Sequence, residues 1–240
     1  GHLTCALAVA DALADLQADP RVLFLCTDKS IDGRFLDPTP WGRIVQPIRP
    51  LPRNPLHLGG FTVRWLGSLR LARRVLRDVK PAAVLGLGGY AAGPAVRVAA
   101  GGVRTAMLNP DAVPGKANRY LARRVDAIFT QFEATAGHFA EALRAKVRCV
   151  GCPVRREILG ADRDAAIGRF GLDASRRTLA VMGGSLGAAS VNDAVAAAAA
   201  PLAKVARGWQ ILHVAGPGKT AALETAYRQA GLAAAVVEFC

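Results

Sequence analysis

The chain has 240 residues, of which 52% are hydrophobic and 6% aromatic, and its formal net charge is +13. This length and apolar content are sufficient for one large α/β domain or two smaller ones, and they exclude a disordered chain. The apolar residues are mainly Ala, Val and Leu, which suits parallel strands covered on both faces by helices and argues against an aromatic platform for nucleic acid.

Short apolar runs alternate with helical patterns along the chain, which predicts parallel sheets built from βαβ units. In chain order, the first series is a helix from Leu3, a strand at 22–26, a helix at 58–79, and strands at 83–87, 104–108, 126–130 and 147–150 with helices between them. The second series is a helix at 162–170, a strand at 178–182, a helix at 188–199, a strand at 210–215, a helix at 220–230 and a strand at 235–239.

The segment 150–154 interrupts this alternation, so we predict two domains, 1–152 and 153–240, of which the second is incomplete. A helical pattern follows Leu3 directly, and an apolar run ends the sequence at Cys240. A doubly wound domain does not normally begin on a helix or stop on a strand. We therefore expect a fragment that lacks a first strand and a C-terminal portion.

The sequence contains no run of about 18 apolar residues, so it predicts no membrane-spanning helix. Its opening residues lack the basic leader of a signal peptide, and its five cysteines are an odd number, which favours a reducing, cytoplasmic compartment over a disulfide framework. Cys149 and Cys152 form one C-x-x-C pair. A zinc site would need a second pair, and Pro153 argues against a redox helix, so we expect no metal.

Positive charge is concentrated between Arg43 and Lys80, where nine basic residues accompany the single acid Asp78. The helix predicted at 58–79 interleaves apolar and basic residues, which predicts docking on an anionic membrane surface. An ordinary surface helix that packs an apolar stripe on the sheet is the alternative. No recognised nucleic-acid motif accompanies the charge, so nucleic acid is not an expected partner.

In a parallel α/β sheet, ligands bind where loops leave the carboxyl ends of strands and enter helices. The loop 183–188 reads G-G-S-L-G-A and follows an apolar strand. Its glycines let backbone amides approach a phosphate, Ser185 adds a hydroxyl donor, and the helix dipole favours a negative charge. A plain tight turn is the alternative, and the pattern favours phosphate binding.

Two other loops permit competing interpretations. The loop 86–94 has glycines that miss the spacing of a dinucleotide motif by one residue, although Asp111 lies at the distance of a ribose-binding acid, so an NAD-type oxidoreductase stays an alternative. The loop 213–220 imitates a nucleotide-triphosphate P-loop, but His213 replaces its first glycine and no magnesium-binding Asp accompanies it, which favours a plain helix start.

Two further features are ambiguous from sequence alone. Asp162-Arg163-Asp164 has the D-x-D form of metal-dependent glycosyltransferases, but its position at a predicted helix start favours a capping role. His2 stands before a helix, where a cap is the ordinary role. A histidine there also suits a general base that activates a sugar hydroxyl, because its pKa lies near neutrality.

Several of these segments occur in the order of a known family's motifs. The matching segments are Gly1-His2-Leu3, Gly89-Tyr90 with Gly93-Pro94, the run 114–122, the run 150–155, and 183–188 followed by Asn192. Together they resemble the MurG family over essentially the whole chain.

This resemblance implies an α/β fold of GT-B type, with two Rossmann-like doubly wound domains, the second incomplete here. It implies an inverting, metal-independent transfer of N-acetylglucosamine from UDP-N-acetylglucosamine to undecaprenyl-pyrophosphoryl-N-acetylmuramyl-pentapeptide, converting lipid I to lipid II in peptidoglycan synthesis. No cofactor is implied, and the enzyme would act peripherally on the cytoplasmic face of the cell membrane. We expect the fragment itself to be inactive. A related GT-B enzyme with another acceptor or sugar remains open.

The resemblance also implies roles for individual residues. His2 would be the catalytic base. The implied contacts of the UDP donor are Arg155, Gly184, Ser185, Gly187, Cys240 and Asp111. The implied acceptor-side residues are Gly88, Gly89, Tyr90, Gly93 and Asn118. The chain departs from the family pattern at Asp111, where the family has Asn, and at Cys152, which also replaces an Asn.

Overall fold

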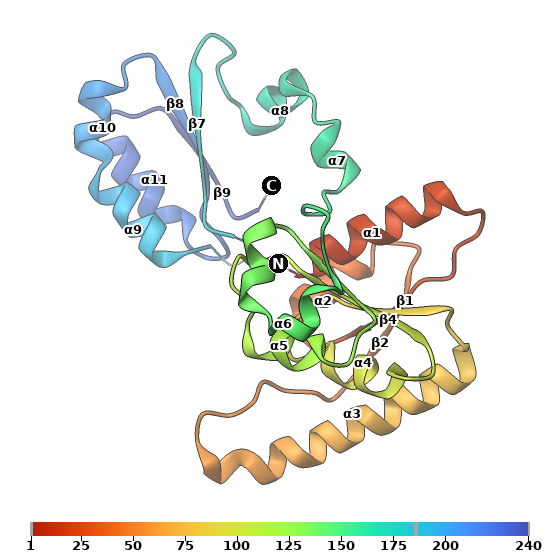
Figure 1. Cartoon of the computed structure of the whole chain (residues 1–240). Helices are drawn as coiled ribbons and strands as arrows, with labels where there is room; N and C mark the ends of the chain where they lie inside the picture. The colour runs from red at the N-terminus through yellow and green to blue at the C-terminus, as the bar shows by residue number, and fades with distance from the viewer. Residues whose placement is uncertain (1, 185–186, 240) are drawn as a thin grey trace. The chain divides into compact units, whose positions relative to one another are not determined.

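A computed structural model describes residues 2–184 and 187–239, with His2 described through its backbone alone. The chain divides into two compact units, His2–Arg156 and Glu157–Cys240, whose elements are drawn in Figure 1. We call them the N-terminal unit and the C-terminal unit. The division falls just after the boundary that the sequence predicts at residue 152.

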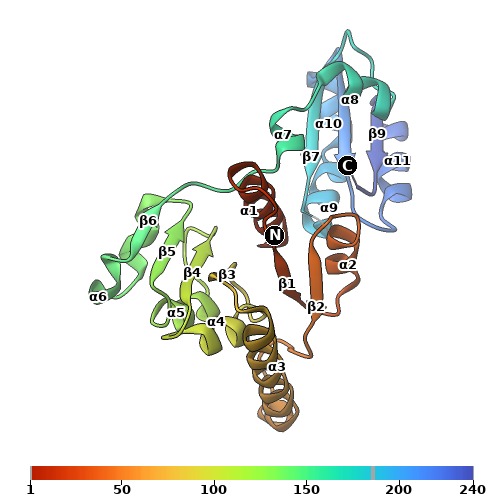
Figure 2. The ribbon, with the colours of Figure 1, turned by 90° about the vertical axis from the view of Figure 1, so that its right-hand side faces the viewer.

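The N-terminal unit contains two parallel sheets. One has the order β1-β2 and the other the order β3-β4-β5-β6, whose four strands lie side by side in Figure 2. The elements are α1 (His2–Leu16), β1 (Leu23–Cys26), α2 (Ser30–Leu36), β2 (Gly42–Val45), η1 (Pro55–His57), α3 (Leu58–Val79), β3 (Ala83–Gly86), α4 (Gly93–Ala99), β4 (Arg104–Asn109), α5 (Lys116–Ala122), β5 (Ala127–Thr130), η2 (Glu133–His138), α6 (Glu141–Arg144) and β6 (Val147–Cys149).

The larger core of this unit lies between the four-stranded sheet and helices α4 and α5. Val96 and Leu121 from these helices pack with Met107 and Ile128 from β4 and β5, and all four are fully buried. A smaller core joins α1, β1 and α2. Gln46, just after β2, connects the two sheets because its side-chain amide donates to the carbonyl oxygens of Leu25 and of Ala91 in the loop after β3.

The C-terminal unit has one parallel sheet of order β7-β8-β9. Its elements are α7 (Arg156–Leu159), α8 (Arg163–Phe170), β7 (Arg177–Met182), α9 (Ala189–Ala197), α10 (Ala199–Val205), β8 (Trp209–Val214), α11 (Thr220–Gln229) and β9 (Ala234–Val237). The central strand β8 contributes Ile211 to a core that includes Leu223 and Tyr227 of α11.

The predicted α/β class with parallel sheets is confirmed, and the predicted helix at 58–79 has the observed bounds of α3. The strand β2 was not predicted, because its four residues G-R-I-V contain an arginine and are mostly exposed. The predicted helix 188–199 also differs, since α9 ends at Ala197 and α10 begins at Ala199. Pro201 lies in the first turn of α10, where a missing backbone N–H disrupts no helical hydrogen bond.

Candidate functional site

The loop between β7 and α9 has the backbone of a glycine-dependent turn. Gly184 and Gly187 have φ angles of +82° and +65°, in the left-handed region that favours glycine. The Gly187 amide donates to the Gly184 carbonyl oxygen at 3.0 Å. Ser185 lies outside the described residues, as does Cys240. The described part of the loop leads directly into α9, as a phosphate-binding loop requires.

Gly187 also fixes this loop against the loop that follows β8. A Cβ atom at Gly187 would overlap the carbonyl oxygen of Ala215, so only glycine permits this approach. The Lys219 ammonium group donates to the Gly187 carbonyl oxygen at 3.2 Å. The two loops are therefore joined at the carboxyl end of the sheet, with a cation between them.

Lys219 is the residue that sequence reasoning did not assign to the site. The signal was present, because Lys219 holds the lysine position of the P-loop-like run 213–220. The sequence favours a plain helix start over a P-loop for that run, and a helix does begin there, because α11 starts at Thr220. The Gly218 amide donates to the Glu238 carboxylate at 2.7 Å, which links this loop to the end of β9.

A buried chain of hydrogen bonds lies beneath these loops. The side-chain amide of Asn192 donates to the Ala215 carbonyl oxygen at 2.9 Å, so its own oxygen faces His213 Nε2, 3.1 Å away. That oxygen can only accept, which places the imidazole proton on Nε2. The bare Nδ1 then accepts from the Tyr227 hydroxyl at 2.6 Å. Asn192, His213 and Tyr227 thus form a directional network that ends on Ala215.

Burial keeps both titratable members of the network neutral. It lowers the pKa of His213 below its ordinary value of 6.5 and raises the pKa of Tyr227 to about 12, because each charged form loses its hydration. At neutral pH the network therefore carries no charge and holds the Ala215 carbonyl against Gly187 by hydrogen bonds alone.

The loop between β3 and α4 contains the predicted acceptor-side glycines. Gly88 and Gly89 have φ angles of +87° and +68°, and the Lys29 ammonium group lies 5.7 Å from the centre of the Tyr90 ring. A Cβ atom at Gly93 would come within 3.0 Å of the Trp65 ring. Gly93 therefore lets Trp65 of α3 pack against the start of α4.

The segment between β4 and α5 is held by a pair of asparagines. Asn118 is only 2% exposed, and its amide donates to the Asn109 side-chain oxygen at 2.6 Å. Asn109 in turn donates to the carbonyl oxygen of Asp111, whose side chain is exposed. The described contacts of Asn118 are thus internal, and the polar group presented to solvent here is Asp111.

The linker that leads to the C-terminal unit passes the first turns of α1. The sulfur atoms of Cys152 and Cys5 are 3.6 Å apart, and burial together with the Cys152 thiol raises the pKa of Cys5. Arg155 is half-buried three residues later. His2 begins α1, and its side chain lies outside the described residues. Cys149 instead donates to the Gln131 carbonyl oxygen, so the C-x-x-C cysteines do not pair with each other.

The D-x-D segment has the capping role that its position predicts. The Asp162 carboxylate accepts from the Asp164 amide at 2.8 Å, at the start of α8. Within residues 2–184 and 187–239, no group of three His, Cys, Asp or Glu side chains is placed to hold a metal ion.

Comparison with known proteins identifies the family. Residues 1–130 match the glycosyltransferase family 28 N-terminal domain. The protein named "UDP-N-acetylglucosamine--N-acetylmuramyl-(pentapeptide) pyrophosphoryl-undecaprenol N-acetylglucosamine transferase" from Nocardioides sp. (strain ATCC BAA-499 / JS614) is 36% identical, over 100% of this chain and 65% of its own length. The protein of the same name from Mycolicibacterium smegmatis is 37% identical, over 96% and 60% respectively. The chain thus spans less than two thirds of these relatives' length.

Solved structures show the same fold. The crystal structure of Acinetobacter baumannii MurG has a TM-score of 0.65 at 24% identity, covering 100% of this chain and 63% of that one. A UDP-GlcNAc 2-epimerase from Neisseria meningitidis, bound to UDP-GlcNAc, has a TM-score of 0.62 at 12% identity, covering 99% and 69%. The family match covers more than half of the sequence and shows glycosyltransferase family 28, and the MurG relatives at 36% and 37% identity are similar over 100% and 96% of this chain. The chain therefore belongs to the MurG family within glycosyltransferase family 28.

Proposed function

We propose that the whole protein transfers N-acetylglucosamine from UDP-N-acetylglucosamine to undecaprenyl-pyrophosphoryl-N-acetylmuramyl-pentapeptide, with inversion and without a metal ion. The observation that carries the donor half of this proposal is the junction of the Gly-rich loop with Lys219 at the carboxyl end of β7 and β8. The acceptor half rests on the family and on the loops of the N-terminal unit.

The main chemical demand of this reaction is the charge that grows on the leaving diphosphate. Preorganised backbone amides at a helix N-terminus stabilise such charge without reorganising during the reaction. Gly184, Ser185 and Gly187 hold the diphosphate at the start of α9, and the Lys219 ammonium group adds a cation beside it. Arg155 contacts the nucleotide, the backbone at Cys240 meets the uracil, and Asp111 accepts from a ribose hydroxyl.

On the acceptor side, His2 removes the proton from the attacking muramyl hydroxyl. The loop of Gly88, Gly89, Tyr90 and Gly93 approaches the lipid diphosphate through its backbone, because left-handed glycines expose amides that a side chain would cover. Asn118 acts by holding the segment between β4 and α5 in place through its hydrogen bond to Asn109. The reaction needs no redox cofactor.

The protein meets its lipid-linked acceptor by peripheral binding to an anionic membrane. Within the described residues no helix is long and apolar enough to cross a membrane. The second half of α3 buries an apolar stripe of Leu69, Ala72 and Val75 in the protein. Its first half and the residues before it instead expose the apolar side chains Leu51, Leu56, Leu58, Val63 and Leu66, beside the exposed Arg53, Arg64 and Arg70.

This apolar and basic surface supports docking better than the alternative of an ordinary surface helix, which accounts only for the buried half of α3. Each basic residue near an anionic leaflet contributes about 1 kcal/mol, and apolar side chains add to this by entering the interface. Trp65, on the same helix, packs against Gly93 of the acceptor loop, so a docked α3 would bring that loop close to the membrane.

The full-length protein tests the proposal. Calorimetry should detect UDP binding, and Ser185→Ala and Arg155→Ala should each weaken it, while Arg144→Ala on α6 serves as a control that removes one arginine elsewhere. Incubation with UDP-N-acetylglucosamine and lipid I should yield the disaccharide product in EDTA. Consumption of the donor with another acceptor, but not lipid I, would instead identify a related GT-B enzyme. Unchanged UDP affinity in both variants would remove the residue assignment.

A further inference from the structure

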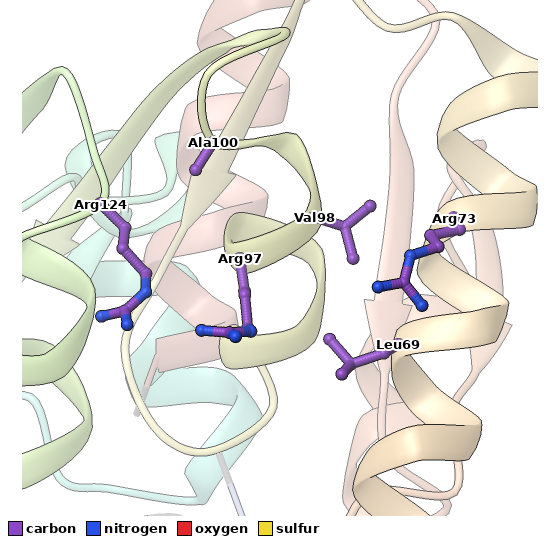
Figure 3. A pocket seen from close by; sticks show the side chains of 6 residues that line it. All are labelled: Leu69, Arg73, Arg97, Val98, Ala100 and Arg124. Carbon is purple, nitrogen blue, oxygen red and sulfur yellow. The ribbon is translucent and has the colours of Figure 1, made fainter.

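A cluster of three arginines lies in the N-terminal unit, apart from the loop of Gly88 to Gly93. Arg73 is on α3, Arg97 is in the last turn of α4, and Arg124 follows α5. Together with Leu69, Val98 and Ala100 they line a pocket of about 290 Å³. Figure 3 shows the guanidinium groups of Arg97 and Arg124 on one side of this pocket and that of Arg73 reaching towards it from α3.

Tyr120 orients two of these arginines. Its hydroxyl accepts from Arg97 Nη1 at 3.0 Å, and its backbone carbonyl accepts from Arg124 Nη1 at 3.0 Å. The Arg124 guanidinium also lies 3.9 Å from the centre of the Tyr120 ring. Such stacking and hydrogen bonding restrict the side-chain freedom that a flexible arginine would otherwise lose on binding.

The cluster has no internal counter-charge. Among the residues that the structure describes, no carboxylate forms an ion pair with Arg73, Arg97 or Arg124. Asp126, two residues after Arg124, is occupied instead by the amide and hydroxyl of Thr105, at 2.8 and 3.0 Å. Three like charges around one small cavity repel one another, and an anion in the cavity would relieve that repulsion.

The pocket is separate from the proposed acceptor-side loop of the same unit. Ala100 caps the C-terminal end of α4, and Arg124 precedes the start of β5, so the pocket lies at the amino edge of the parallel sheet. The loop of Gly88 to Gly93 leaves the carboxyl end of β3. Six residues of β4 separate the two edges, which corresponds to roughly 20 Å.

We propose that this pocket binds a phosphate group of a ligand other than the transfer substrates. Guanidinium groups approaching from two helices and from the segment after a third match the several oxygens of a phosphate better than the two oxygens of a carboxylate. Leu69 and Val98 give the same cavity an apolar side for the carbon skeleton of a phosphate ester. Two sources offer this chemistry: the headgroup of an anionic phospholipid, and a free phosphate ester.

Neighbouring arginines on α3 provide a matched pair of variants. Arg73 lines the pocket, and Arg74 does not, while both are exposed. Arg73→Gln and Arg74→Gln therefore remove the same charge from the same helix, and only the first removes a donor from the pocket. Arg97→Gln is a second pocket variant from another helix. Circular dichroism and thermal unfolding check that all three variants are folded.

Two binding measurements on the chain distinguish the sources. Glycerol 3-phosphate is titrated by calorimetry, and vesicles of phosphatidylglycerol or of phosphatidylcholine are tested by co-sedimentation. Loss of a charge-assisted hydrogen bond should weaken binding roughly tenfold in Arg73→Gln and Arg97→Gln, whereas Arg74→Gln should weaken it much less, by its share of the general surface charge alone. That pattern with glycerol 3-phosphate identifies a site for free phosphate esters. The same pattern with phosphatidylglycerol vesicles alone identifies a lipid headgroup site.

Two results would overturn the proposal. If Arg73→Gln and Arg74→Gln weaken vesicle binding equally, the arginines act only through general surface charge. If neither glycerol 3-phosphate nor phosphatidylglycerol vesicles bind at low salt, the pocket holds no phosphate. Neither result bears on the proposed sugar transfer, because UDP binding and product formation are measured separately. A failure of phosphatidylglycerol vesicles to bind would also contradict the proposed membrane docking.

Discussion

Tyr227→Phe tests the buried network beneath the donor loops without assuming any function. The substitution keeps the ring that packs with Ile211 and Leu223 and removes only the hydroxyl that donates to His213 Nδ1. His213 is fully buried, so water cannot replace the lost donor. Moving the proton to Nδ1 would leave Nε2 facing the Asn192 oxygen, two acceptors with no proton between them.

No neutral arrangement therefore satisfies the remaining groups. A buried polar atom left without its partner costs about 1–3 kcal/mol, and we expect Tyr227→Phe to lower the free energy of unfolding by that amount. The matched control is Tyr120→Phe, whose hydroxyl is exposed and accepts only from the exposed Arg97. It should stay within about 0.5 kcal/mol of wild type.

The two units need not unfold together, so the assay must report on the C-terminal one. Trp209 in β8 provides this signal once Trp41 and Trp65 are replaced by Phe in all variants. Urea unfolding is then followed by fluorescence. If Tyr227→Phe and Tyr120→Phe change the free energy equally, the network does not stabilise the fold as described.

The same network predicts the pH dependence of stability. The folded-state pKa of His213 is below its unfolded value of 6.5, so the unfolded chain binds more protons as the pH falls. The stabilisation of the folded state by neutral His213 is therefore present above pH 6.5 and is lost as the pH falls below 6.5. The pKa of Tyr227 is raised from 10.0 to about 12, so its contribution is present below pH 10 and is lost as the pH rises towards 12. The difference in unfolding free energy between wild type and Tyr227→Phe should therefore fall above pH 10, and a constant difference would contradict this assignment.

Three further predictions concern the loops, the linker and the docking surface, and a fourth concerns the base. Gly187→Ala should weaken UDP binding and lower stability because its Cβ would overlap the Ala215 carbonyl oxygen. Gly208→Ala is the control for backbone strain alone, because Gly208 has a φ of +75° with open space around it. Equal effects of the two variants on UDP affinity would contradict the packing argument. Diamide should form a disulfide between Cys5 and Cys152, detected by peptide mass spectrometry. The disulfide should appear in wild type and in Cys149→Ser but not in Cys5→Ser. A Cys149–Cys152 disulfide instead would refute the observed pairing. Leu56→Ser and Val63→Ser, at side chains exposed by 88% and 71%, should weaken binding to phosphatidylglycerol vesicles, whereas Leu16→Ser, at a side chain exposed by 86% outside this surface, should not. Equal behaviour of the three Ser variants would rule out docking through this surface. Neutralising Arg70, Arg73, Arg74 and Arg77 should make the remaining binding less sensitive to salt. His2→Ala in the full-length enzyme should reduce turnover by roughly two to four orders of magnitude with donor affinity preserved, and a near-normal rate would exclude His2 as the base.

The sequence by itself determined the fold class, most of the elements and the family. Buried parallel strands are continuous apolar runs, and a helix as long as α3 repeats its apolar residues often enough to be recognised. The Gly-rich loop after β7 was recognisable because only glycine adopts its left-handed angles at low cost. Short exposed pieces such as β2 carry no such pattern, because their pairing is decided by a neighbouring strand.

Other features required the tertiary structure because their members are distant in sequence. Cys5 and Cys152 meet across 147 positions, and the 183–188 loop meets Lys219 only because β7 and β8 are adjacent strands. Asn118 was expected to line the acceptor side, and its burial against Asn109 depends on how α5 packs on β4. Arg73, Arg97 and Arg124 converge for the same reason. A local pattern records the periodicity of one element, whereas the contacts between elements are decided by packing, which no single segment encodes.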